Sequence, residues 1–208
     1  MTAAERKRPF YLVLALLGAL ALGVHGASGG WERVRQYRET VEVTQIARGI
    51  ADEGDRAAFV SRFQAFVAVL DSVKNRGWPI AVGSLILGTA VMVFAMRALG
   101  GNRGARAVLM QLVVAQAGLD AANHWLLRDL LKAELALDRA AFFAQSHEAF
   151  SDRRRAEDVA SAHALWSRVA VPVFFGLRML GSALIVVALV QRRSRDLLDA
   201  STAPIEER

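Results

Sequence analysis

The stretch that decides the fold is Pro172–Val190, PVFFGLRMLGSALIVVALV, which is apolar throughout except for Arg178 near its middle. An apolar run of this length is typical of a helix that spans a membrane. A charge inside such a helix is costly in lipid, so it indicates a partner or a polar cavity. The basic segment at residues 191–195 follows at once and is typical of the cytoplasmic end of a span.

The composition of the 208-residue chain indicates a membrane protein with substantial aqueous parts. It is 54% hydrophobic and 22% charged, with a mean hydropathy of +0.28, which is too apolar for an ordinary soluble domain. There are no cysteines, which excludes disulfides and cysteine-ligated metals. The net charge of +6 does not indicate nucleic acid, because the basic residues lie at the ends of apolar runs, where membrane topology explains them.

Four apolar runs predict an all-α integral membrane protein with four transmembrane helices, at about residues 9–28, 79–97, 106–127 and 169–190. The first run has two interpretations. Its basic start and the small residues near Ala27 fit a cleaved signal peptide, but the run is long for one, and His25 fits a cleavage site poorly. We favour a retained helix. It has small residues every four positions, which suits close contact with another helix: Ala15, Ala19, Gly23 and Ala27.

The segment between the first two spans is predicted to form a helical hairpin outside the membrane. Glu32–Asp52 is predicted as one helix, with Asp55 as the N-cap of the next. Gly77 and Pro79 are expected to end that second helix and to begin the span. Apolar residues recur on the second helix in steps of four and three, which predicts that its face packs on the other arm: Phe59, Phe63, Phe66, Leu70 and Val73.

A second outer hairpin is predicted between the third and fourth spans, from helices over residues 128–150 and 153–168. The later helix is expected to continue into the fourth span, with Pro172 kinking it but not ending it. Basic residues near the N-terminus, over 97–106 and over 192–195 lie on one side of the membrane if there are four spans. The positive-inside rule therefore predicts a plasma-membrane protein with both termini in the cytoplasm. The abundance of alanine and arginine favours a bacterial source.

The chain is predicted to be a tandem repeat of one two-span copy, residues 1–99 and 100–208, the second with a short cytoplasmic tail. When Pro79 is aligned with Pro172, Gly88 meets Gly181, and other pairs also coincide: Gly83 and Gly176, Leu87 and Leu180, Thr89 and Ser182. The aligned prolines and glycines favour duplication more than matching leucines would. Ser84 and Gly88 are expected to mediate close helix contact between the two copies.

One set of polar residues is predicted to lie together inside the membrane. Asp120 is fourteen residues past Arg106, and Arg178 is fourteen before Arg192, so each lies about 21 Å from the cytoplasmic edge at a rise of about 1.5 Å per residue. His25 lies at a similar depth. Gln116, Asp120 and His124 are spaced by four and share one helix face. The predicted candidate site is this set: His25, Gln116, Asp120, His124 and Arg178.

Three hypotheses explain this polar cluster. An Asp120–Arg178 ion pair that fixes helix register is the interpretation that we favour. The second is a water-accessible site for protons, ions or a polar ligand, and the third is haem or metal held by His25 and His124. We read His147 and His163, in the second outer hairpin, as surface or packing residues.

The sequence alone supports a class of function and not an activity. We expect a non-enzymatic membrane protein, a scaffold, accessory subunit or sensor-like module whose outer helices meet a protein partner or a second copy, with no cofactor. A small transporter or channel with Asp120 and Arg178 on a polar path is the alternative. A haem- or metal-binding membrane protein is the third. The spans contain no recognisable catalytic motif.

Overall fold

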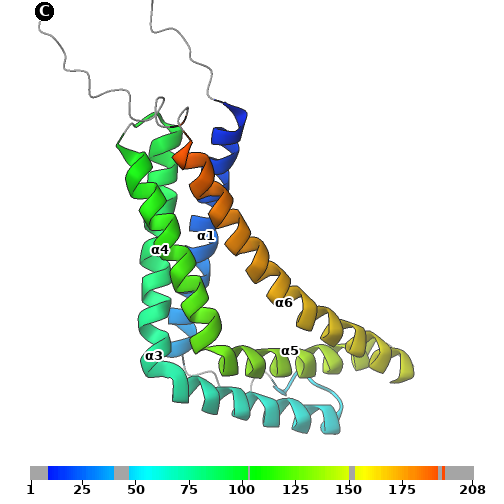
Figure 1. Ribbon diagram of the computed structural model, residues 1–208. Coiled ribbons are helices and arrows are strands. Elements are labelled where there is room, and N and C mark those ends of the chain that lie inside the picture. The colour runs from blue at the N-terminus through cyan, green and yellow to red at the C-terminus, as the bar shows by residue number, and fades with distance from the viewer. Residues whose placement is uncertain (1–8, 40–46, 103, 150–152, 192–193, 195–208) are drawn as a thin grey trace, which may run out of the picture. The chain divides into compact units, whose positions relative to one another are not determined.

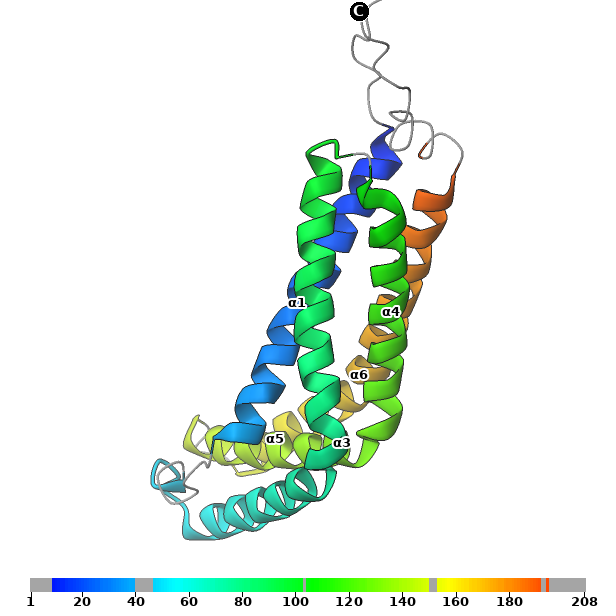
Figure 2. The same ribbon diagram turned by 90° about the vertical axis from the view of Figure 1, so that its left-hand side faces the viewer.

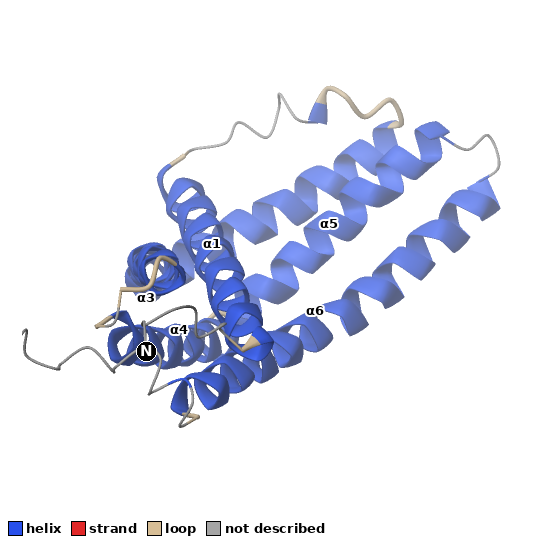
Figure 3. Ribbon diagram, turned by 90° about the horizontal axis from the view of Figure 1, so that it is seen from above, coloured by secondary structure: helices blue, strands red, loops and turns tan. Residues whose placement is uncertain are grey.

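The computed structural model describes residues 9–39, 47–102, 104–149, 153–191 and 194, and within these the only regular elements are helices (Figure 3). The helices are α1 (Phe10–Arg38), α3 (Glu53–Leu99), α4 (Ala105–Leu126), α5 (Arg128–Ala149) and α6 (Arg153–Val190). The predicted all-α fold is therefore confirmed for the described residues. The basic residues at 6–8, 103, 192–193 and 195 lie outside them.

Three of these helices are long and apolar enough to cross a membrane: Phe10–Arg38, Glu53–Leu99 and the part Glu157–Val190 of α6. These three helices indicate a membrane-spanning protein. Among the described residues α4 is not one of them, because polar side chains interrupt its apolar sequence.

The chain folds into two compact units, and each combines residues from both halves of the sequence. Unit 1 comprises Met1–Glu32, Ile80–Ala121 and Gly176–Arg208, and unit 2 comprises Arg33–Pro79 and Ala122–Phe175. The helices α1, α3, α4 and α6 each contribute residues to both units. The predicted duplication, in contrast, divides the chain at residue 99 and stays a prediction.

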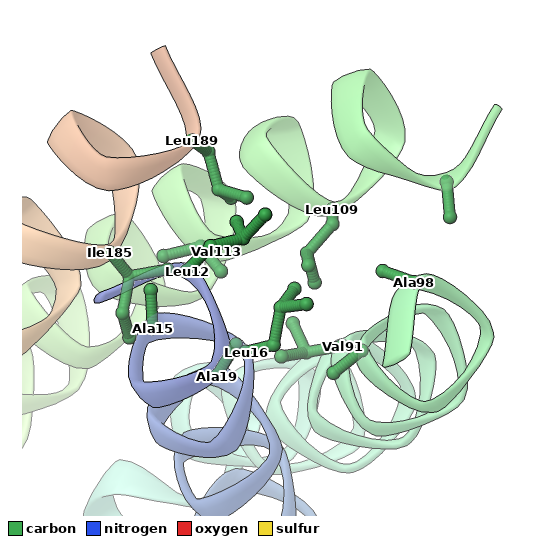
Figure 4. Packing of buried hydrophobic residues seen from close by; sticks show 12 residues of the cluster. Leu12, Ala15, Leu16, Ala19, Val91, Ala98, Leu109, Val113, Ile185 and Leu189 are labelled. Carbon is green, nitrogen blue, oxygen red and sulfur yellow. The ribbon is translucent and has the colours of Figure 1, made fainter. Parts of the chain in front are cut away.

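Unit 1 is a bundle of four helical segments, which lie side by side in Figures 1 and 2. Figure 4 shows how apolar side chains from all four segments meet in one core. α1 and α3 contribute Leu12, Leu16 and Val91, and the other two helices contribute Leu109 and Leu189; each of these side chains is fully buried. The core residues of each helix are spaced by three or four, such as Leu109 and Val113 on α4 and Ile185 and Leu189 on α6, which places them on one face.

Polar contacts join the helix ends at one end of unit 1. The Arg106 guanidinium at the start of α4 donates to the Leu189 carbonyl oxygen at the end of α6, at 3.0 Å. Arginine is favourable there because the last helical carbonyls lack partners within the helix. The Tyr11 hydroxyl at the start of α1 lies 3.4 Å from the Ser194 hydroxyl. The start of α1 and the end of α6 therefore lie at the same end of this unit.

Backbone contact between α1 and α3 depends on glycine. A Cβ atom on Gly23 would lie 2.6 Å from the Met92 backbone nitrogen, and one on Gly88 would lie 2.6 Å from the Gly26 carbonyl carbon. A Cβ on Gly30 would lie 2.8 Å from the Ala81 carbonyl oxygen. No real side chain fits at such distances, so the two backbones touch directly, as in other membrane helix pairs with small residues at the contact.

These contacts correct one prediction and support another. Ala15, Ala19 and Gly23 are buried, as the ladder of small residues on α1 predicted. The prediction that Gly88 mediates contact between the two copies is wrong, because Gly88 packs on α1 of its own copy. Gly181 of α6, which aligns with Gly88, faces open space, since a Cβ there would meet no neighbouring atom within 4 Å. The sequence shows which helix faces carry small residues, but it does not show which neighbouring helix each of these faces contacts.

Unit 2 has its own apolar core. Phe59 and Phe63 of α3 are buried against Leu137, Ala140 and Ala141 of α5. The predicted apolar face of α3 is confirmed, since all five of its residues are at most 9% exposed: Phe59, Phe63, Phe66, Leu70 and Val73. The end of α1 also packs in this unit, where Arg33 binds both carboxylate oxygens of Glu134, with Nη2 to Oε2 at 2.6 Å. The apolar face of the first hairpin therefore packs on a helix of the second.

Two local predictions for the first hairpin are wrong. α1 ends at Arg38 and residues 48–52 are not helical, so Glu32–Asp52 is not one helix; residues 40–46 lie outside the described residues. The N-cap of α3 is Asp52, not Asp55, because the Asp52 carboxylate accepts a hydrogen bond from the Asp55 backbone N–H at 2.8 Å. Both aspartates precede the apolar face, and the choice between them depends on where the backbone turns.

The predicted break at Gly77 and Pro79 is also wrong, because α3 runs unbroken through both residues. Gly77 admits the ring of Tyr37, whose hydroxyl lies at the place that a Cβ on Gly77 would occupy. The Tyr37 and Trp78 rings meet edge to face, with centroids 6.4 Å apart. Pro79 therefore lies inside a continuous helix, where it removes one backbone donor. Pro172 lies inside α6 in the same way, as predicted.

We predict that Gly88→Ala lowers the free energy of unfolding by about 1–3 kcal/mol, because the new methyl group must separate two touching backbones. Gly181→Ala is the matched control, since it occupies the aligned position and has open space. It is expected to leave stability unchanged or to raise it by up to about 1 kcal/mol, the helix propensity of alanine over glycine. Thermal unfolding in detergent measures both, and equal effects would contradict the α1–α3 contact.

Candidate functional site

An ion pair joins α4 to α6 inside unit 1. The Arg178 Nη2 atom lies 2.8 Å from Asp120 Oδ2, and the two side chains are 28% and 10% exposed. Gln116, one turn earlier on α4, donates from Nε2 to Asp120 Oδ1 at 3.1 Å. Both carboxylate oxygens of Asp120 therefore have a donor, which is what a charge in a place of low polarity requires.

The first helix contributes a glycine to this cluster. Gly26 of α1 is buried against the Gln116 side chain, and a Cβ there would lie 3.0 Å from Gln116 Nε2. The absence of a side chain at Gly26 gives the amide room to lie beside Asp120. Sequence analysis missed Gly26, although the series Gly23, Gly26 and Gly30 on one helix was visible.

Of the five predicted site residues, the structure joins three by direct polar contacts: Gln116, Asp120 and Arg178. His25 of α1 interacts electrostatically with both Arg178 and Asp120, but its side chain is exposed. His124 belongs to unit 2, where its ring stacks on that of Phe175 with centroids 4.3 Å apart. Among the described residues, no three histidine, aspartate or glutamate side chains are placed to hold a metal ion.

Two polar atoms of the cluster have no hydrogen-bond partner within the described residues: Gln116 Oε1 and Arg178 Nε. The first is an acceptor and the second is a donor. An ion pair with both partners present is neutral overall. The cluster therefore adds no net charge to the interior of the bundle.

Unit 2 contains a groove that sequence analysis did not find. It has a volume of about 710 Å³ and lies along one face of α5. Figure 3 shows the helix α5 between the first part of α3 and the first part of α6. We call it the basic groove. Its lining contains four basic and no acidic side chains, with mostly alanine between them: Ala58, Arg62, Lys132, Leu135, Ala136, Arg139, Ala140, Phe143, Ala164, Ser167 and Arg168.

The two other histidines lie in unit 2. The His163 ring stacks on Phe142 with centroids 4.0 Å apart, and its Nε2 lies 3.7 Å from Asp138 Oδ2. This supports the interpretation of His163 as a packing residue. His147 lies in α5.

No known protein family, characterised protein or solved structure matches this chain. The function must therefore be inferred from the two units themselves.

The ion pair makes a quantitative prediction. Arg178→Leu is expected to destabilise the protein by about 3–5 kcal/mol, because it leaves the buried Asp120 carboxylate without its partner, and Asp120→Asn by less, because Arg178 is only partly buried. The double variant is expected to lose less than the sum, with a coupling energy of about 1–3 kcal/mol. Thermal unfolding of the four proteins in detergent measures this cycle.

The control is the exposed pair Arg35–Glu39 at the end of α1, whose Nε and Oε2 atoms lie 3.8 Å apart. Its cycle of glutamine variants is expected to give at most about 0.5 kcal/mol, because water screens it. A coupling as small for Asp120 and Arg178 would show that the buried pair does not form.

Proposed function

We propose that this chain is a non-enzymatic integral membrane protein of the bacterial plasma membrane, a scaffold or sensor-like module whose unit 2 meets a protein partner. The observation that supports this is that the part of the chain between the apolar runs folds as a compact unit with its own core. Phe59 and Phe63 pack on α5, and Arg33 binds Glu134 there. Loops that only connect spans have no need of such a core.

We also propose that α4 is a fourth span, although its sequence is less apolar than the other three. The polar residues that interrupt it point into the bundle, where Gln116 is 3% and Asp120 9% exposed. Polar side chains that face the interior of a bundle are compatible with a membrane helix, whereas lipid-facing ones are not. Leu109 and Val113 on the same face belong to the core shared with α1, α3 and α6.

The proposed topology places both termini in the cytoplasm and unit 2 outside. The contact between Tyr11 and Ser194 supports this topology, because it places the start of α1 and the end of α6 at the same end of unit 1. The proposed duplication is supported by Pro79 and Pro172, which lie inside long helices at aligned positions. Each copy then contributes two spans and an outer hairpin, and the hairpins pack on each other.

Cysteine labelling tests the topology, because the chain has no cysteine of its own. In intact cells, a membrane-impermeant maleimide is expected to label Ser161→Cys, in the outer part of α6. Asn102→Cys, in the turn between α3 and α4, is expected to react only after the membrane is permeabilised. If α4 did not cross the membrane, the two positions would react on the same side.

Photo-crosslinking in native membranes tests the partner. A photoreactive residue at exposed positions of unit 2, Ala65 and Ser161, is expected to give a product of one defined mass, which shows whether the partner is a second copy or another protein. Leu184 and Val114 of unit 1 are the controls, being exposed at 59% and 56% on helices proposed to face lipid. Protein products at the controls and none at Ala65 or Ser161 would contradict the proposal.

A small transporter or channel is the second candidate, and one observation favours it. Gln116 Oε1 and Arg178 Nε are buried without a partner among the described residues, so a moving polar solute has groups to bind. This candidate requires solute flux into liposomes that Asp120→Asn abolishes. The scaffold or sensor-like function requires none.

A further inference from the structure

The basic groove of unit 2 is built on one helix face. Its α5 residues lie at intervals of three and four, so they share a face: Lys132, Leu135, Ala136, Arg139, Ala140 and Phe143. Ala58 and Arg62 of α3 flank this face on one side, and Ala164, Ser167 and Arg168 of α6 flank it on the other. The volume of about 710 Å³ lies within the range of small-molecule sites, roughly 300–1,000 Å³.

The charges of the groove are all of one sign. Arg62, Arg139 and Arg168 form no ion pair within the described part of the chain, and all three residues are exposed. Lys132 has an acidic neighbour, Asp129, at 3.6 Å, but both of these side chains are mostly exposed. The four basic groups therefore produce a positive potential over the groove, which attracts an anion.

The floor of the groove is apolar, and this restricts the kind of anion. Leu135, Phe143 and four alanines form most of the lining between the basic residues. A fully hydrophilic anion would leave this surface in contact with water. An anion with an attached hydrocarbon chain fits both the basic and the apolar lining of the groove. The hydrocarbon chain covers the apolar residues while the charged group lies among the arginines.

The position of the groove along α6 indicates where such a ligand comes from. Arg168 lies four residues before Pro172, which is about 6 Å along the helix axis, in a helix that is long and apolar enough to span a membrane. A basic residue at that distance from an apolar span is within reach of lipid headgroups. We propose that the basic groove binds an anionic phospholipid, with its phosphate among Arg62, Arg139 and Arg168 and part of an acyl chain along α5.

This inference rests on the part of the proposed function that places α6 across the bilayer, and it does not depend on a protein partner. Lipid binding is measured on the purified full-length protein. Its failure would therefore leave the topology and crosslinking results unaffected.

The test is a titration of the protein in neutral detergent with phosphatidylglycerol or with phosphatidylcholine of the same chains, followed by native mass spectrometry. One phosphatidylglycerol is expected to bind, at least about tenfold more tightly than phosphatidylcholine. Arg62→Gln/Arg139→Gln is expected to weaken its binding by roughly 10- to 30-fold, the effect of two basic groups near an acidic lipid. Both side chains are exposed, so the variant is expected to fold normally.

Two further variants separate the groove from general charge effects. Arg48→Gln/Arg155→Gln removes two exposed arginines of unit 2 that do not line the groove, and it is expected to change binding less than twofold. Ala58→Trp fills the groove from an exposed position and keeps all four charges, so it is expected to weaken phosphatidylglycerol binding too. Millimolar inorganic phosphate is expected to leave the lipid bound.

Three results would overturn the proposal. Equal binding of the two lipids would show that the charge has no role. Equal losses in the two arginine double variants would show that the groove is not the site. Displacement of the lipid by inorganic phosphate or by micromolar oligoglutamate would show instead a site for free anions or for an acidic protein.

Discussion

The cost of placing a carboxylate among apolar helices determines how unit 1 is built. Asp120 is nearly buried, and it is tolerable there only because Arg178 of α6 and Gln116 of α4 donate to its two oxygens. Gln116 in turn needs the open space at Gly26 of α1. The same part of α1 touches α3 at Gly88, backbone to backbone. The Asp120 carboxylate is thus linked to all four helices: to α6 by the salt bridge, to α1 through Gln116 and Gly26, and from α1 to α3 through Gly88.

Unit 2 is built differently, because its described core is apolar and its bidentate ion pair lies partly exposed beside it. The aromatic face of α3 packs on α5, and the bidentate pair of Arg33 with Glu134 adds the end of α1. α5 also lines the basic groove, where its basic side chains are exposed, and Ala140 belongs to both the core and the groove. The two units therefore differ in chemistry: unit 1 contains a neutral ion pair inside the bundle, and unit 2 has a groove lined by basic and apolar side chains.

Helix periodicity and residue type were sufficient for part of this structure. The spacing of the apolar residues from Phe59 to Val73 predicted a buried helix face, and the structure confirms it. The equal distances of Asp120 and Arg178 from basic residues on their helices predicted an ion pair, and their Oδ2 and Nη2 atoms lie 2.8 Å apart. Local signals were less reliable. Gly77 and Pro79 resemble a helix break, yet Gly77 is where α3 receives the Tyr37 ring, and α3 continues. In a sequence, a glycine that ends a helix cannot be distinguished from one that leaves space for a side chain of a neighbouring helix.

The sequence by itself determined which segments are apolar enough to be helices in a membrane, which face of α3 is buried, and how far along their helices Asp120 and Arg178 lie. These properties depend on the order of residues along a single helix, where a rise of about 1.5 Å per residue converts position to distance. Only the tertiary structure decided that Gly88 meets α1, that Gln116 lies on Gly26, and that α5 is shared between an aromatic core and a basic groove. Those facts depend on which helices are neighbours, and small residues, phenylalanines and arginines are compatible with many neighbours until the packed bundle selects one.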